Sequence, residues 1–136
     1  MKSKVLLVFA ISTAISLLAG CCGLIPPQGA VSFAKTELAA LARQRDVEIT
    51  EIQVEDYYEG DVSPADRANG IQAYASFDLR YACRCSWAEN WSNCVSHYAL
   101  RKVNGTWERN PNLPGLNTDM MPDCTLPTPT PVPWSG

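Results

Sequence analysis

The sequence is poor in two kinds of residue on which many functions depend, basic residues and histidine. It holds eleven lysines and arginines against fourteen aspartates and glutamates, and its single histidine is His97. The net charge of −3 is too acidic for a protein that holds nucleic acid through phosphate contacts, so we exclude nucleic acid as a partner. A serine, histidine and aspartate triad would have to use His97, yet no nucleophile-elbow motif surrounds the nearby Ser92 or Ser96. We therefore interpret His97 as a histidine on a sheet surface.

Long apolar runs are also scarce, and the one that is present lies at the N-terminus. Residues 5–18 are apolar apart from three serine and threonine residues, and two lysines precede them. A membrane-spanning helix needs about 20 predominantly apolar residues. The run is shorter than that and has the charged start and apolar centre of a signal peptide, so it predicts export rather than a permanent transmembrane anchor.

The apolar run ends in Leu18, Ala19, Gly20 and Cys21. This ending resembles the signature of bacterial lipoproteins, in which a leucine, two small residues and a cysteine close the signal sequence. The resemblance implies a signal peptide over residues 1–20, cleavage after Gly20, and fatty acids such as palmitate attached to Cys21 through diacylglycerol. Two or more acyl chains hold a protein firmly at a membrane. We therefore expect a lipid-anchored protein of the bacterial cell envelope that faces the periplasm or the exterior.

A second cysteine follows the first, which makes Cys22 an alternative acylation site. Lipidation of Cys22 would put Cys21 at a position that the lipoprotein family usually fills with glycine, alanine or serine, so Cys21 is preferred. Position 22 also lacks the aspartate that serves this family as one inner-membrane retention cue. The choice between the inner and the outer membrane stays open.

The mature chain divides into a tether, one folded domain and a tail. Residues 21–30 contain two consecutive prolines and form the lipidated tether, and residues 31–124 form the domain. Residues 125–136 are rich in proline and threonine, which predicts an extended, disordered tail. Removal of residues 1–20 takes away two basic residues and no acid, so the mature net charge is about −5.

The spacing of apolar residues changes within the first half of the domain. Apolar residues recur at helical spacing from Val31 to Leu41, which predicts a helix over residues 30–44. Residues 47–58 alternate instead, with a shift of the apolar phase that predicts a strand with a β-bulge near residues 50–51. Glycine, proline and asparagine over residues 60–70 predict a loop and a turn.

The strongest pattern in the chain covers residues 71–87. Every odd position there is apolar or cysteine and most even positions are polar, so we expect a long strand with one buried face. Its outward residues include Asp78 and Arg80, which we expect to pair with neighbouring side chains rather than to act as acid and base.

The chain beyond this strand predicts a hairpin. Residues 94–103 form a further strand, and Asn104 with Gly105 is the preferred dipeptide of a type I′ turn, because both positions need positive φ. A two-residue turn sets Arg101 opposite Glu108, which pairs opposite charges. Between residues 110 and 124, Pro111, Pro114 and Pro122 argue against regular structure.

Four cysteines remain beyond the tether: Cys83, Cys85, Cys94 and Cys124. An even number in an exported chain predicts two disulfides. Cys83 and Cys85 lie roughly 6–7 Å apart on one strand, which is awkward for a mutual bond. We prefer Cys85 with Cys94 and Cys83 with Cys124, because the matching register also pairs apolar residues across the strands. The alternative, Cys83 with Cys94 and Cys85 with Cys124, stays open.

The residue types of a zinc site are also present, in Cys83, Cys85, Cys94 and His97. Two arguments oppose a metal. Exported thiols tend to oxidise, and two strand residues three positions apart, such as Cys94 and His97, point to opposite faces. We expect no metal and no cofactor.

Together these elements describe an α+β fold in which one N-terminal helix packs on an antiparallel meander of about four strands, braced by disulfides. The segment from the helix to the closing hairpin resembles the cystatin-like and nuclear transport factor 2-like group. Many members of that group end with a strand bearing tyrosine and leucine, an Asn-Gly or Asp-Gly turn, and a tryptophan. The corresponding residues here are Tyr98, Leu100, Asn104, Gly105 and Trp107.

The chain also departs from that group in two ways. It shows one helix where the transport-factor-like proteins usually have three. The glutamine-valine-glycine loop of inhibitory cystatins is missing, since Gln53 and Val54 are followed by Glu55. The resemblance therefore assigns no catalytic or inhibitory residue.

Two tryptophans, Trp87 and Trp91, flank the loop after the long strand. Aromatic residues at a loop tip can stack on sugars or anchor in a protein partner, although Trp87 also continues the inward face of the strand. Our leading hypothesis is a non-enzymatic envelope lipoprotein that binds a protein or a glycan through the sheet face and the Trp91 loop. The alternative is a small-molecule-binding or hydrolytic domain with a pocket between helix and sheet that holds His97, Asp78 or Tyr74.

Overall fold

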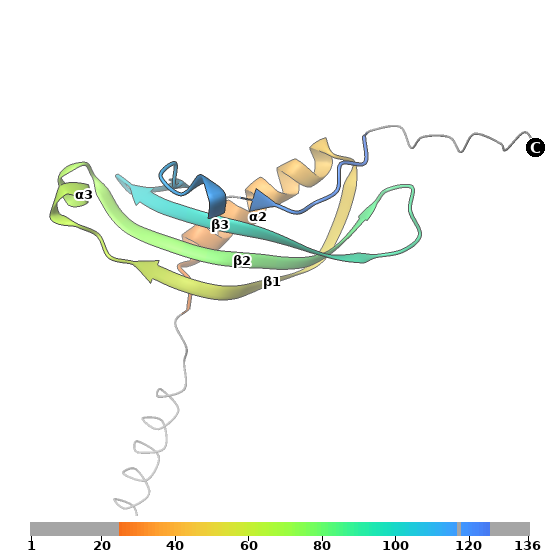
Figure 1. The fold of residues 1–136 in the computed structure, drawn as a ribbon, viewed down its shortest axis with the longest axis horizontal. Helices are drawn as coiled ribbons and strands as arrows, with labels where there is room; N and C mark the ends of the chain where they lie inside the picture. The colour runs from red at the N-terminus through yellow and green to blue at the C-terminus, as the bar shows by residue number, and fades with distance from the viewer. Residues whose placement is uncertain (1–24, 117, 126–136) are drawn as a thin grey trace, which may run out of the picture.

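A computed structural model of the protein describes residues 25–116 and 118–125, which form one helix packed on an antiparallel sheet (Figure 1). This arrangement confirms the predicted α+β fold. The predicted signal peptide, the lipidation site Cys21 and the proline-rich tail beyond residue 125 lie outside the described residues.

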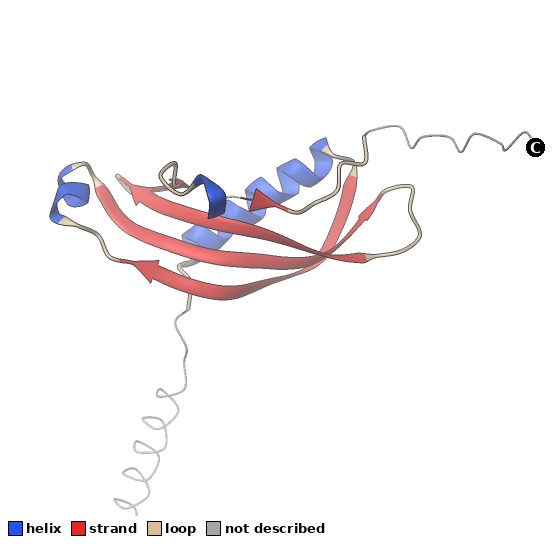
Figure 2. Ribbon diagram, in the orientation of Figure 1, coloured by secondary structure: helices blue, strands red, loops and turns tan. Residues whose placement is uncertain are grey.

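Helix α2 (Gln28–Gln44) begins directly after Pro27, two residues earlier than the sequence predicts. Its buried face consists mainly of small side chains, since Ala30, Ala34 and Ala42 accompany Leu38 at a spacing of four residues. Residues four apart lie on one side of a helix, and small side chains let the helix approach the sheet closely. The helix covers only one face of the sheet (Figure 2).

Four strands follow in meander order: β1 (Val47–Gly60), β2 (Ile71–Cys85), β3 (Ser92–Val103) and β4 (Thr106–Arg109). In β2 the odd positions face the helix, and Phe77, Leu79 and Tyr81 are almost fully buried there. The predicted alternation is therefore correct. The core forms between these side chains and the alanine-rich face of α2.

Strand β1 contains two irregularities, which bend it and break its regular pairing. The register with β2 shifts between Thr50 and Gln53, where Glu51 has a φ of 57°, as the predicted bulge requires. A second shift, which the sequence analysis did not predict, lies around Asp56, whose φ is 50°. Bulges of this kind twist an edge strand and make it a poorer template for pairing with another chain.

The loop between β1 and β2 holds a short helix that was predicted only as loop and turn. Helix α3 (Pro64–Ala68) begins with a capping box. The Ser63 hydroxyl accepts from the backbone N–H of Asp66, and the Asp66 carboxylate accepts from the backbone N–H of Ser63. The hydrogen bond from Ser63 lowers the pKa of the Asp66 carboxyl. Reciprocal capping explains why five residues suffice for a helical turn here.

The closing hairpin forms as predicted. Asn104 and Gly105 have φ values of 49° and 86°, and the register sets Arg101 opposite Glu108. The Nε atom of Arg101 donates to Glu108 over 2.6 Å. Trp107 packs against the core from the inward face.

The segment after β4 contains more regular structure than its prolines suggest. A 3-10 turn, η2 (Pro114–Leu116), precedes a two-residue strand, β5 (Thr118–Asp119), which pairs with Ser96 and His97 of β3. Strands β4 and β5 therefore share one edge of β3. The prolines are compatible with this because all three lie outside the paired residues of β5.

The two disulfides follow the pairing that was not preferred. Cys83 is bonded to Cys94 and Cys85 to Cys124, with Cα separations of 5.9 and 5.4 Å. The preferred pairing of Cys85 with Cys94 is wrong because the assumed strand register is wrong. Tyr81 lies opposite Cys94, so that Cys83 becomes the diagonal neighbour of Cys94. Cys85 is bonded instead to Cys124. The backbone N–H of Cys124 also donates to the carbonyl oxygen of Arg45, which fixes the C-terminal segment beside the end of α2.

Candidate functional site

The face of the sheet opposite α2 carries most of the cross-strand charge pairs. Glu48 lies opposite Arg84, and Asp78 lies opposite His97, so these side chains share that face with the other even residues of β2. We call this surface the outer face and define it by the even residues from Tyr74 to Arg84 and their ladder partners. Helix α2 packs on the other side of the sheet, and the short helix α3 reaches only the Tyr74 end of the outer face, where Asp66 is hydrogen-bonded to Tyr74 (Figure 2).

At one end of the outer face Trp91 lies against a fixed cation. The guanidinium carbon of Arg84 is 4.5 Å from the centre of the Trp91 ring. Arg84 is itself held by Glu48, with its Nε donating to Oε2 over 2.7 Å. Trp91 nevertheless keeps 45 % of its surface exposed. The ring is thus restrained on one side and open to solvent on the other.

A groove of about 340 Å³ lies beside the Trp91 ring. Its base crosses three strands, because Thr50 of β1, Ala82 of β2 and Asn93 of β3 lie side by side in the ladder. Its other lining residues are Glu51, Trp91 and Ser92. We call this cavity the tryptophan groove.

A second cavity, of about 350 Å³, lies further along the outer face and contains His97. The Nδ1 atom of His97 is 2.6 Å from an Oδ1 of Asp78, its direct partner across the strands. Both side chains are partly exposed, at 36 % and 21 %. The remaining lining residues are Asp56, Tyr58, Ser76, Phe77 and Tyr98. We call this cavity the histidine groove.

The two tryptophans singled out in the sequence behave differently. Trp91 lines the tryptophan groove, whereas Trp87 lies in the turn after β2 and is 62 % exposed. The expectation that Trp87 continues the inward face is wrong, because β2 ends at Cys85 and the chain turns there through a bond from the N–H of Ala88 to the carbonyl of Cys85. His97 and Trp91 share the outer face but line separate grooves.

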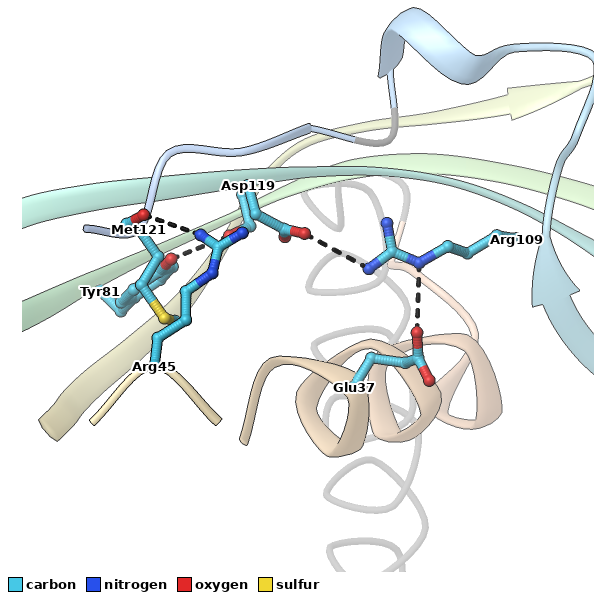
Figure 3. Close-up of polar contacts among 7 residues, drawn as sticks. Glu37, Arg45, Tyr81, Arg109, Asp119 and Met121 are labelled. Carbon is cyan, nitrogen blue, oxygen red and sulfur yellow. Dashed lines mark hydrogen bonds and ion pairs between the residues drawn. The ribbon is translucent and has the colours of Figure 1, made fainter. Parts of the chain in front are cut away.

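A network of charges on the helix side was not found by sequence reasoning (Figure 3). Arg109 of β4 donates to Glu37 of α2 over 3.2 Å and lies 3.6 Å from Asp119 of β5. Arg45, at the end of α2, donates to the carbonyl of Met121 over 2.8 Å. These contacts join the C-terminal segment to the helix. Their members are distant in sequence, so no spacing rule would have revealed them.

Buried tyrosines lie beside this network. The hydroxyl groups of Tyr81 and Ser96 are 2.8 Å apart, whereas the Tyr98 hydroxyl and Oδ1 of Asp119 have no hydrogen-bond partner among the described residues. Burial raises the pKa of both tyrosines, and the nearby Asp119 carboxylate raises it further. Both effects favour the protonated phenol.

The two grooves and three further surface cavities among the described residues have no lining residue from α2, so none of these five extends between helix and sheet. Among the described residues no three histidine, cysteine, aspartate or glutamate side chains are arranged to hold a metal ion. The described helices also include none that is long and apolar enough to cross a membrane.

Comparisons with protein-family models, with curated proteins and with solved structures find no match to this chain.

Proposed function

We propose that this protein is a lipid-anchored lipoprotein of the cell envelope that binds a protein or a glycan on its outer face and has no catalytic role. The N-terminal apolar run, which ends in Leu18, Ala19, Gly20 and Cys21, supports the lipid anchor. Paired cysteines support an oxidising compartment, since disulfides persist mainly in exported proteins.

The observation that carries the binding role is the uncovered outer face itself. It presents a restrained, exposed aromatic ring, at the end of the loop before β3, beside a groove whose base crosses three hydrogen-bonded strands. The base residues Thr50, Ala82 and Asn93 lie on regular strands, which hold side chains more precisely than loops do and so suit a recognition surface.

The alternative of a ligand pocket between helix and sheet finds less support. The side chains that meet there, including Ala34, Leu38, Leu79 and Leu100, are at most 1 % exposed. Such close packing leaves little room for a ligand.

A second candidate function, hydrolysis, is favoured by one observation, the hydrogen bond between His97 and Asp78 in an open groove. A catalytic histidine needs a nucleophile within hydrogen-bond reach. Ser76 lines the same groove but makes no hydrogen bond to His97 among the described residues. Turnover of p-nitrophenyl acetate that is lost in His97→Ala would establish this function in place of binding alone.

The anchor is tested by intact mass analysis of the full chain isolated from bacterial membranes. We expect a chain that begins at Cys21, carries diacylglycerol and contains two disulfides. A Cys21→Ser variant should keep its leader and lose the fatty acids. A wild-type chain with an uncleaved leader and free thiols would overturn the proposal.

The binding role is tested by photo-crosslinking in the living cell. A photoreactive residue replaces either Gln53, exposed on the outer face opposite Arg80, or Thr36, exposed on α2. We expect the Gln53 position to form a covalent adduct of higher mass and the Thr36 position to form none. Equal labelling at both positions would contradict binding by the outer face.

A further inference from the structure

The tryptophan groove has an aromatic wall that is positioned before any ligand arrives. Arg84 lies over the Trp91 ring, and a 2.6 Å contact between an Arg84 nitrogen and Glu48 fixes the arginine. A side chain that is already restrained loses little rotational freedom on binding, which lowers the cost of association.

The base and edges of the groove offer neutral hydrogen-bonding groups around a small residue. Ala82 lies between Thr50 and Asn93 in the ladder, so the middle of the groove is shallow and apolar while its two sides carry a hydroxyl and an amide. Both groups can donate and accept hydrogen bonds.

The charge of the groove disfavours anionic ligands. Its one charged lining residue is Glu51, which is exposed and forms no ion pair or hydrogen bond with any other described residue. The nearest arginines, Arg80 and Arg84, are already paired with Glu55 and Glu48. A phosphate or carboxylate would meet an unpaired carboxylate, whereas a hydroxyl group could donate to it.

A sugar ring combines the features that this groove complements. One face of a pyranose presents C–H groups that stack on an aromatic ring, and its edge carries hydroxyls that both donate and accept. We propose that the tryptophan groove binds a neutral oligosaccharide, with one ring stacked on Trp91 and its hydroxyls bonded by Thr50, Asn93 and Glu51. This inference rests on the proposed function and names the ligand of the same face.

The volume is consistent with a short saccharide. Small-molecule sites are usually about 300–1,000 Å³, and this groove measures about 340 Å³.

The test uses the lipidated full chain in a detergent without a sugar headgroup. Chitotetraose and maltotetraose are the neutral probes, and a hyaluronan tetrasaccharide is the anionic one. Binding is followed through the indole N–H resonances, assigned with Trp91→Phe, and in every variant through the backbone amide resonances of Thr50, Ala82 and Asn93. We expect at least one neutral probe to shift the Trp91 resonance at millimolar concentration, and the anionic probe to bind more weakly.

Two variants make the test specific. Trp91→Ala should weaken binding by about tenfold or more, as expected for the loss of one stacking contact. Trp87→Ala removes an even more exposed tryptophan that lines neither groove, and should leave binding unchanged. Because both side chains are exposed, neither variant should impair folding.

The outcomes separate this inference from the proposed function. Absence of any shift with both neutral probes, equal loss in Trp87→Ala, or preference for hyaluronan would overturn the saccharide assignment. If the Gln53 crosslink nevertheless captures a protein of the envelope, the outer face still binds, but its ligand is a protein. If neither experiment detects a ligand, both proposals fall.

Discussion

Arg84 stacks over Trp91, with 4.5 Å between its guanidinium carbon and the ring centre. This contact explains how Trp91, the last loop residue before β3, can keep one orientation while 45 % of its surface is exposed. An exposed cation–π contact contributes about 0.5–1 kcal/mol, so Arg84 acts on the position of the ring more than on the stability of the fold.

Replacing Arg84 should therefore disturb Trp91 without unfolding the protein. In Arg84→Met we expect a broadened and shifted Trp91 indole resonance and a loss of about 1 kcal/mol in urea unfolding. Arg80→Met is the matched control, because Arg80 also pairs with a glutamate but lies over no described ring. An unchanged Trp91 resonance in Arg84→Met would show that the contact is absent in solution.

The disulfide connectivity can be mapped with two proteases. Trypsin cuts after Arg84, between Cys83 and Cys85, and a glutamate-specific protease cuts after Glu89, between Cys85 and Cys94. We expect the peptide with Cys83 to be linked to the one with Cys94, and the peptide with Cys85 to the C-terminal peptide. Linkage of Cys85 to Cys94 would restore the pairing that the sequence favoured.

That pairing shows where sequence reasoning reaches its limit. Alternation along β2 identifies the buried face, and the Asn104 and Gly105 turn fixes the β3 to β4 register, because a two-residue loop leaves no freedom. The longer connection from β2 to β3 leaves the register free to slip by an even number of residues. Each such slip keeps the same side chains inward, so the hydrophobic pattern alone could not select the correct register of β2 and β3.

The parts of the site that were missed share a different cause. Asp119 lies in a two-residue strand, which is too short to show any period, and it meets Arg109 only after the chain has returned to the edge of β3. Helix α3, by contrast, carried a readable signal, because Ser63 stands three residues before Asp66 with Pro64 between them. The tryptophan groove joins Thr50, Ala82 and Asn93, which only the ladder brings together.

Stability should fall in alkali because of the tyrosines. Desolvation and a 2.7 Å hydrogen bond to Glu59 raise the pKa of Tyr57 to about 12, and burial raises the pKa of Tyr81 and Tyr98. The folded protein therefore holds these protons more tightly than the unfolded chain, whose tyrosines ionise near pH 10. This contribution is complete below pH 10 and declines as the pH rises toward 12.

Two measurements check this expectation. Urea unfolding at increasing pH should show a free energy that decreases above pH 10, and Tyr57→Phe should make the decrease shallower. Absorbance at alkaline pH should show Tyr81 and Tyr98 ionising only as the protein unfolds. Full ionisation of every tyrosine with the near-ultraviolet circular dichroism of the folded state intact would contradict the burial of these two rings.

Removing the charge of Arg109 should weaken the attachment of the C-terminal segment. Arg109→Met leaves Asp119 partly buried without its cation, and we expect a loss of about 1–3 kcal/mol in urea unfolding. Arg43→Met is the control, since Arg43 is exposed in the last turn of α2 and its loss should cost less than about 1 kcal/mol. In an Asp119→Asn background the cost of Arg109→Met should shrink, and additive costs would show that the two residues do not interact.

Two glycines with the same backbone conformation should differ in their tolerance of alanine. Gly105 has a φ of 86°, and no atom lies within 4 Å of the position that an added Cβ would take. Gly105→Ala should therefore lower the free energy of unfolding by about 1 kcal/mol through backbone strain alone. Gly70 has a φ of 81°, but a Cβ there would lie 2.5 Å from Oδ1 of Asn104. Gly70→Ala should therefore cost about 1 kcal/mol more, since it adds a steric clash. The double variant Gly70→Ala with Asn104→Gly removes the opposing side chain while keeping the turn, and urea unfolding should then show a cost for the alanine that matches Gly105→Ala. If the alanine costs as much without the Asn104 side chain as with it, the clash is not the cause.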